Sequence, residues 1–167
     1  FSTADASNAF YRQALAAGDR KLQERDWVTA RDDFRRAMMA QPKESVPQDR
    51  MAAAGAALEA ERAEIRALCQ KWDYTGAAAF IAARQGSKVH GTLLEEYTDN
   101  ALAGIEQLQR AEKYADARKW ITFHHSQFPR HRRLVEGLQA ANGGTLPPAR
   151  PENAVTTAQT ELAQLKL

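Results

Sequence analysis

One short pattern occurs three times along the chain and limits its fold more than any other feature. Each copy has an aromatic residue, an alanine three positions later and a large apolar residue four positions after the alanine. The alanine and the large residue share one helix face, and the small alanine lets a second helix approach closely. We therefore expect repeated helical hairpins, with each aromatic residue packed back across the preceding turn. The copies are Trp27-x2-Ala30-x3-Phe34, Tyr74-x2-Ala77-x3-Ile81 and Tyr114-x2-Ala117-x3-Ile121.

The prolines also favour an all-helical chain. All six fall between long alanine-rich segments, so none has to interrupt a helix, where a proline costs about 3 kcal/mol. No segment shows the sustained alternation with β-branched residues that is typical of strands. The predicted helices cover residues 4–24, 27–41, 47–71, 74–85, 92–112, 114–127, 130–141 and 151–166.

Several helix ends have their own local signals. Thr92 and Glu95 have the spacing of a capping box, which predicts that a helix begins there. Pro47 and Pro151 suit the first turn of a helix. The Asn-Gly-Gly sequence at 142–144 predicts a left-handed stop at a helix C-terminus.

The first copy of the pattern resembles the tetratricopeptide repeat, whose signature has glycine, aromatic, alanine, aromatic, alanine and proline at the same spacing. The resemblance is specific over residues 11–42 and looser over 5–130. Successive aromatic residues are 47 and 40 positions apart, against 34 in the standard repeat, so the intervening helices or loops must be longer. The matching residues are Gly18, Trp27, Ala30, Phe34, Ala37 and Pro42.

The resemblance implies an all-α fold, a right-handed stack of antiparallel helical hairpins forming a tetratricopeptide-like α-solenoid with a C-terminal capping helix. We expect the capping helix to dock on its own chain, because a short isolated helix is marginal in water. The alternative is that it contacts a second copy and forms a homo-oligomer. The expected parts are a repeat domain at 1–142 (hairpins 4–41, 47–85 and 92–127, with a helix at 130–141), a linker at 143–150 and a helix at 151–167.

The resemblance further implies a non-catalytic scaffold that binds a peptide or a segment of another protein in a groove formed by the first helix of each hairpin. The family's groove positions, carried over by spacing, fall on polar residues whose paired donors suit carboxylates or phosphates. The simpler interpretation is that these residues are solvated faces of long helices. The candidates are Arg12, Asp19, Gln23, Arg62, Arg66, Gln70, Glu106, Gln109 and Arg110.

The alternative function is binding of nucleic acid or another polyanion through residues 110–133. This segment has seven basic and two acidic residues, and it also contains Trp120, Phe123 and Phe128. Basic stripes with interleaved aromatic residues are typical of such surfaces, although aromatic residues at helical spacing are more often core. The whole chain carries a net charge of only +2. The basic corner that ends this segment and opens the next helix consists of Arg130, His131, Arg132 and Arg133.

Histidines also gather in this region, but their spacing does not favour a metal site. His124 replaces the small residue that closes a hairpin, so we expect a packed, hydrogen-bonded side chain. His125 points about 100° away on a helix, which is poor geometry for one ion. The single cysteine, Cys69, lies in the apolar phase of its helix and is expected in the core. We therefore predict neither a metal nor another cofactor.

No local sequence motif indicates an enzyme. The chain has no HExxH, Walker-type loop, strand-linked GxGxxG or GxSxG elbow, so an active site would have to be assembled from distant residues. His90 lies in a predicted loop without a local partner. No run approaches the roughly 20 apolar residues of a membrane span, so we expect no membrane insertion. The compartment is open between the cytoplasm and the soluble part of a larger envelope protein.

Overall fold

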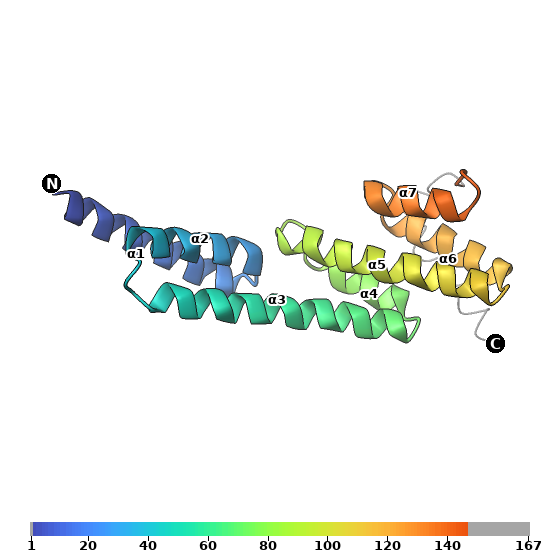
Figure 1. The fold of residues 1–167 in the computed structure, drawn as a ribbon, viewed down its shortest axis with the longest axis horizontal. Coiled ribbons are helices and arrows are strands. Elements are labelled where there is room, and N and C mark those ends of the chain that lie inside the picture. Colours follow the sequence, from blue (N-terminus) through green and yellow to red (C-terminus); the bar gives the residue numbers. More distant parts are fainter. Residues whose placement is uncertain (1, 147–167) are drawn as a thin grey trace. The chain divides into compact units, whose positions relative to one another are not determined.

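The structure is a computed structural model, and it describes residues 2–146 (Figure 1). The described residues form seven α-helices and no strand, which confirms the all-helical prediction. The helices are α1 Thr3–Gln23, α2 Trp27–Ala40, α3 Val46–Gln70, α4 Tyr74–Ala82, α5 Val89–Arg110, α6 Tyr114–Gln127 and α7 Arg132–Ala141. The predicted helix at 151–166 and most of the linker lie outside the described residues.

The described chain divides into two compact units. The first comprises residues 2–65 and 81–94, and the second comprises residues 66–80 and 95–146. Helices α3, α4 and α5 each contribute residues to both units. The long first helices that the wide spacing of the repeat requires are present, since α3 has 25 residues and α5 has 22.

The three copies of the pattern follow turns with the same backbone geometry. Arg25, Trp72 and Glu112 each precede the aromatic residue by two positions and have φ angles of 60°, 61° and 60°. In each turn the next residue donates its backbone N–H to the carbonyl five positions earlier, at 2.8–2.9 Å. This is the Schellman arrangement that closes a helix C-terminus. Each copy of the pattern therefore follows a helix that ends with the same local backbone geometry.

The small residues of the pattern allow close helix contact, as expected. The alanines of all three copies are buried, and so are the large residues four positions later. In the first unit, Phe34 covers Gly18 so closely that a Cβ added to this glycine would collide with the ring. Ala30, Phe34 and Ala54 form a buried cluster, with Leu15, Leu22 and Met51 packed against it.

The second unit has an aromatic core around Tyr74. Its ring meets Trp120 at a centroid distance of 4.7 Å, His124 at 4.6 Å and Tyr97 at 6.0 Å, all edge to face. Such pairs add stability beyond the area that they bury. On another side of α5, α7 packs closely enough that a Cβ on Gly137 would lie 2.6 Å from Leu102.

The aromatic residue that opens each second helix does not have the same environment in all three copies. Tyr74 is buried and Trp27 is half-buried, with its indole N–H donating to Glu61 Oε2 at 2.8 Å. Tyr114 is 53% exposed, so the expectation that it packs back across its turn is wrong. The described residues leave the outer side of this ring to solvent.

The capping box predicted at Thr92 is also wrong. Helix α5 begins at Val89, whose N–H donates to the Ser87 hydroxyl at 3.2 Å, so Thr92 lies inside the helix. The same early start puts His90 in the first turn of α5 and not in a loop. Helix α7 starts at Arg132, two residues later than predicted, because residues 129–130 form a turn.

The other local signals are confirmed. Pro47 lies in the first turn of α3. The left-handed stop after α7 is present at Gly143 and Gly144, and the Gly144 N–H donates to the Gln139 carbonyl at 2.7 Å. Pro151 lies outside the described residues.

Candidate functional site

The groove candidates of the first unit lie on α1 and α3 and differ in exposure. Arg12 and Gln23 are exposed on α1. Asp19 is half-buried and accepts from Arg50 Nη1 at 2.6 and 2.8 Å, an ion pair that joins α1 to α3. Arg62 is half-buried and pairs with Glu59 at 3.1 Å within α3. The two exposed side chains are thus the clearest candidates for contact with another molecule.

The candidates of the second unit include two residues with structural contacts. Arg66 donates to Glu96 Oε1 at 2.8 Å, and the buried carboxylate of Glu96 makes this pair part of the packing between α3 and α5. Gln109 donates to the Ala141 carbonyl at 2.8 Å and so contacts the end of α7.

The remaining three candidates of the second unit are exposed. Gln70 lies at the end of α3, and Glu106 and Arg110 form a 2.6 Å ion pair one turn apart on α5.

Two of the four residues of the basic corner contact acidic residues of α5. Arg133 donates to Glu95 Oε2 at 2.7 Å and contacts Asp99 at 2.8 Å. His131 Nε2 lies 2.9 Å from the other oxygen of Glu95. Positive charge at the start of α7 opposes the helix dipole, and these carboxylates of α5 offset that cost. These ion pairs also explain why Arg133 is found at the start of α7, which the sequence alone does not explain.

The other two arginines of the corner face solvent. Arg132 pairs with Glu136 at 2.8 Å within α7, and both side chains are exposed. Arg130 is exposed in the turn before α7.

The aromatic residues of the basic segment are not available to stack on bases. Trp120 and Phe123 are buried, and Phe128 is half-buried with its ring 4.9 Å from that of Tyr97. A surface that binds single-stranded nucleic acid presents such rings to solvent. The interleaved aromatic residues therefore no longer favour polyanion binding, and only the basic charge of the segment still does.

His124 is a buried core residue, as predicted. It is fully buried, and its Nδ1 shares a hydrogen bond of 2.6 Å with the Tyr97 hydroxyl. Burial lowers the pKa of His124 to about 3, so the imidazole is neutral at neutral pH. Burial also raises the pKa of Tyr97 well above its usual value. Among residues 2–146, no group of three or more potential metal ligands comes together.

The second unit has a small notch next to this aromatic core. Its volume is about 220 Å³, and Cys69, Trp72, Tyr74 and Gly104 are among its lining residues. Cys69 is buried, as expected, and burial, together with the nearby carboxylates of Glu96 and Asp73, raises the pKa of its thiol to about 12. The thiol is therefore protonated and a poor nucleophile at neutral pH.

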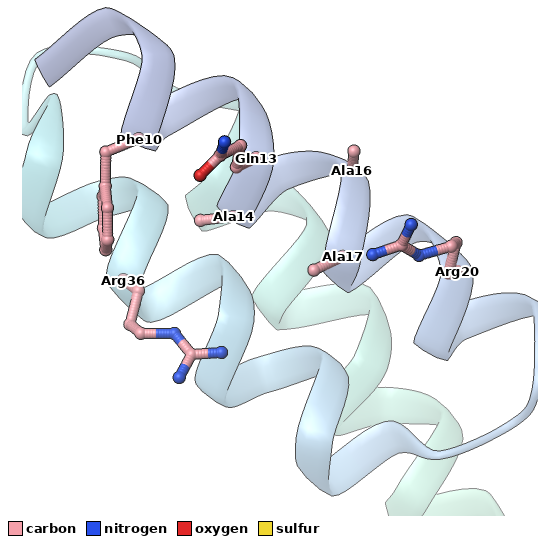
Figure 2. A pocket seen from close by; sticks show the side chains of 7 residues that line it. All are labelled: Phe10, Gln13, Ala14, Ala16, Ala17, Arg20 and Arg36. Atoms are coloured by element: carbon pink, nitrogen blue, oxygen red, sulfur yellow. The ribbon is translucent and has the colours of Figure 1, made fainter. Parts of the chain in front are cut away.

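The first unit has a larger open groove between α1 and α2. Its volume is about 500 Å³, and its lining combines apolar and basic side chains. Figure 2 shows Phe10 extending from α1 towards Arg36 on α2. The sequence reasoning missed this groove, although Phe10 is a large apolar residue outside the repeated pattern. The lining residues are Phe10, Gln13, Ala14, Ala16, Ala17, Arg20 and Arg36.

Comparison of the chain with protein-family models, with curated proteins and with solved structures found no match in any of the three. Within residues 2–146, no helix combines the length and the apolar character that a membrane crossing requires.

Proposed function

We propose that this protein is a non-catalytic interaction scaffold, similar to tetratricopeptide-repeat proteins, that binds a peptide or a segment of another protein. The observation that carries the proposal is the repetition of one hairpin turn. In each of the three turns one residue has the left-handed backbone conformation, and the same backbone hydrogen bond closes the turn; these residues are Arg25, Trp72 and Glu112. Repeated hairpins offer a partner the same helix faces at successive positions, which suits an extended segment.

Exposed polar side chains on the first helices are the proposed contacts. Arg12 and Gln23 on α1, Gln70 on α3 and Arg110 on α5 all face solvent. Their donors suit carboxylate or amide oxygens of a partner. Asp19, Arg66 and Gln109 act in support, because their contacts with Arg50, Glu96 and Ala141 hold neighbouring helices together.

The proposal is tested by affinity capture followed by direct titration of each captured protein against purified variants. Arg12→Glu with Gln23→Glu alters the surface of the first unit, and Gln70→Glu with Arg110→Glu alters that of the second. Arg66 is left unchanged, since a glutamate there would face the buried Glu96.

Arg35→Glu, on the exposed side of α2, is the charge-reversal control. We expect at least one pair of changes to weaken a partner that the control binds normally. A partner whose affinity neither pair changes would contradict the proposal.

A further inference from the structure

The groove between α1 and α2 leaves a large apolar side chain in solvent. Phe10 is 48% exposed, while Ala14 and Ala17 beside it add little bulk, so the groove has a shallow apolar floor (Figure 2). Arg20 and Arg36 add positive charge to its lining. A groove of about 500 Å³ lies in the size range of sites that bind ligands or side chains.

The second unit contains the counterpart of this groove, and the repeated turn gives the correspondence residue by residue. Phe10 lies 15 residues before the left-handed Arg25, as Tyr97 lies 15 before Glu112. Ala17 and Gly104 are each eight residues before the same turns. The α1 face with Phe10 and Ala17 and the α5 face with Tyr97 and Gly104 are therefore the same feature of two equivalent hairpins.

In the second unit this feature is filled by the start of another helix. Trp72 and Tyr74 flank Asp73 at the beginning of α4, and Tyr74 packs edge to face on Tyr97 at 6.0 Å. A Cβ added to Gly104 would collide with the Tyr74 hydroxyl and lie 3.5 Å from the Trp72 ring. Tyr97 is consequently fully buried, in contrast to its counterpart Phe10.

We propose that the α1/α2 groove, lined by Phe10, Ala14, Ala17, Arg20 and Arg36, binds the first turn of a helix from another protein that begins with aspartate followed by phenylalanine. The segment that covers the equivalent face of α5 begins its helix in this way, with an aspartate cap in front of an aromatic residue. Asp73 Oδ1 accepts from the Gly76 N–H at 2.9 Å and so caps α4.

The differences between the two grooves determine the preferred sequence. Ala17 replaces Gly104, and its Cβ occupies the position that would collide with the hydroxyl of a tyrosine placed as Tyr74 is. Phenylalanine has the same ring without that hydroxyl, so it fits where tyrosine does not. The site thereby discriminates between the two aromatic residues by shape.

Charge gives a second preference. Arg20 and Arg36 stand where the second unit has the uncharged Gln107 and Phe123, at the same distances from the turn. Although Arg36 also pairs with Asp33, the two guanidinium groups make the α1/α2 groove more positive than its counterpart. An acidic segment is therefore favoured, through charge-assisted hydrogen bonds that weaken as salt is added.

The groove shares only part of its surroundings with the surface of the proposed scaffold function. Arg12 and Gln23 each lie one turn from a lining residue of the groove, Ala16 and Arg20 respectively. The scaffold contacts Gln70 on α3 and Arg110 on α5 do not line it. Loss of binding at one surface therefore does not imply loss at the other.

The test uses synthetic peptides and the full 167-residue chain. The first peptide spans residues 72–83 of this chain with Tyr74→Phe, and the second has the unchanged sequence; Asp73 is the only charged side chain in either. A third, with Trp72→Ala and Tyr74→Ala, lacks both aromatic rings. We expect the phenylalanine peptide to shift amide resonances of α1 and α2 in NMR titrations and to bind at least about tenfold more tightly than the tyrosine peptide, a difference of about 1.4 kcal/mol. The third peptide should not bind.

Variants of the chain make the result specific. Ala17→Gly should bring the tyrosine peptide to within about threefold of the phenylalanine peptide, since the obstructing Cβ is gone. Ala17→Trp should fill the groove and abolish binding, while Ala60→Trp, on the exposed side of α3, should not. Gln70→Glu with Arg110→Glu, neither of which lines the groove, should also leave peptide binding unchanged, which separates this test from that of the scaffold function.

Three outcomes would overturn the inference. The first is peptide binding that survives Ala17→Trp. The second is self-association of the chain, seen by sedimentation, that Ala17→Trp removes, since the occupant would then be a second copy. The third is binding that appears only after deletion of residues 147–167, since the chain's own C-terminal segment would then occupy the groove.

Discussion

One buried residue of the second unit, His124, makes the stability of that unit depend on pH. His124 replaces the alanine that closes the equivalent hairpin of the first unit, Ala37, and it is buried among the rings of Tyr74, Tyr97 and Trp120. A neutral imidazole can be accommodated there through its hydrogen bond with Tyr97. An imidazolium would carry an uncompensated charge into an apolar core, which explains why its pKa is lowered to about 3.

The His124 imidazole should make the protein less stable as the pH falls below about 6.5, the unperturbed pKa of histidine. Between that value and the folded-state pKa of about 3, the unfolded chain binds a proton that the folded chain does not. The free energy of unfolding therefore falls by up to about 1.4 kcal/mol per pH unit in this window, and the contribution is complete above it. Urea denaturation at a series of pH values measures this slope.

The control for this effect removes both hydrogen-bonding partners. Tyr97→Phe with His124→Leu removes both partners of this hydrogen bond, so neither is left buried and unpaired, and the double variant should fold. It retains His90, His125 and His131, and its slope between pH 6.5 and 5 should be smaller than that of the wild type. Equal slopes would show that His124 is not the group responsible.

Glu112 has a backbone conformation that is unfavourable for a residue with a side chain. Its φ angle of 60° lies in the left-handed region, where a side chain costs roughly 1–2 kcal/mol and glycine is preferred. Glu112→Gly should therefore stabilise the protein by about 1 kcal/mol. The gain is measured as a higher midpoint of urea denaturation. The matched control is Lys119→Gly, inside α6, which should lower stability by about 1 kcal/mol. A loss of stability with Glu112→Gly would mean that its side chain contributes more than the strain costs.

At the scale of elements, the three turns differ in how their second helices are capped. Asp26 accepts from the Thr29 N–H at 3.2 Å, and Asp73 accepts from the Gly76 N–H at 2.9 Å. Lys113 occupies the same position before α6 and makes no side-chain cap. Its charge is also unfavourable at a helix N-terminus.

Lys113→Asp should supply the missing cap. An aspartate at this position can accept from the N–H of Asp116 and favours the helix dipole, which together should stabilise the protein by about 0.5–2 kcal/mol. Thermal and urea denaturation measure the gain. Lys113→Ala separates the two causes, since it removes the charge without adding a cap and should recover only the smaller part. If both variants gain equally, capping is not the reason.

The elements were predictable from the sequence to a greater extent than their contacts. Proline and glycine positions and the repeated pattern gave all seven helices in the described residues, because backbone preferences act locally. The start of α5 was missed because the helix begins at Val89, whose N–H donates to the Ser87 hydroxyl, and Ser87 lacks the glutamate three residues later that marks a capping box at Thr92. The exposure of Tyr114 was missed because it depends on what lies beyond its turn, and the sequence around Tyr74 is similar.

The candidate site was less predictable than the helices. Spacing selected Arg12 and Gln23, which are exposed, and equally selected Arg66, which pairs with the buried Glu96. Such pairing depends on side chains about 30 residues away in the sequence. The sequence did not predict a ligand for the groove beside Phe10. That proposal comes from comparing the groove with the equivalent face of the second unit, which Trp72 and Tyr74 cover.

For the whole molecule, the two units predict that local packing defects have local effects. The contact between Gly18 and Phe34 lies within the first unit, and that between Gly137 and Leu102 lies within the second. Repeat proteins derive their stability from such neighbouring contacts, so segments can open separately. We expect Gly18→Ala to lower hydrogen-exchange protection in α1 and α2 while leaving α6 and α7 unchanged. Gly137→Ala should have the opposite pattern.

Each added methyl group should lower the free energy of local opening by about 1–3 kcal/mol. A change of this size can be resolved by hydrogen exchange detected by mass spectrometry. Gly55→Ala is the control, because nothing lies within 4 Å of a Cβ at that position in α3. This change should increase protection, since alanine favours a helix by about 0.5–1 kcal/mol over glycine. A uniform loss of protection along the chain in both overpacked variants would show that the continuous helices α3, α4 and α5 make the two units unfold as one.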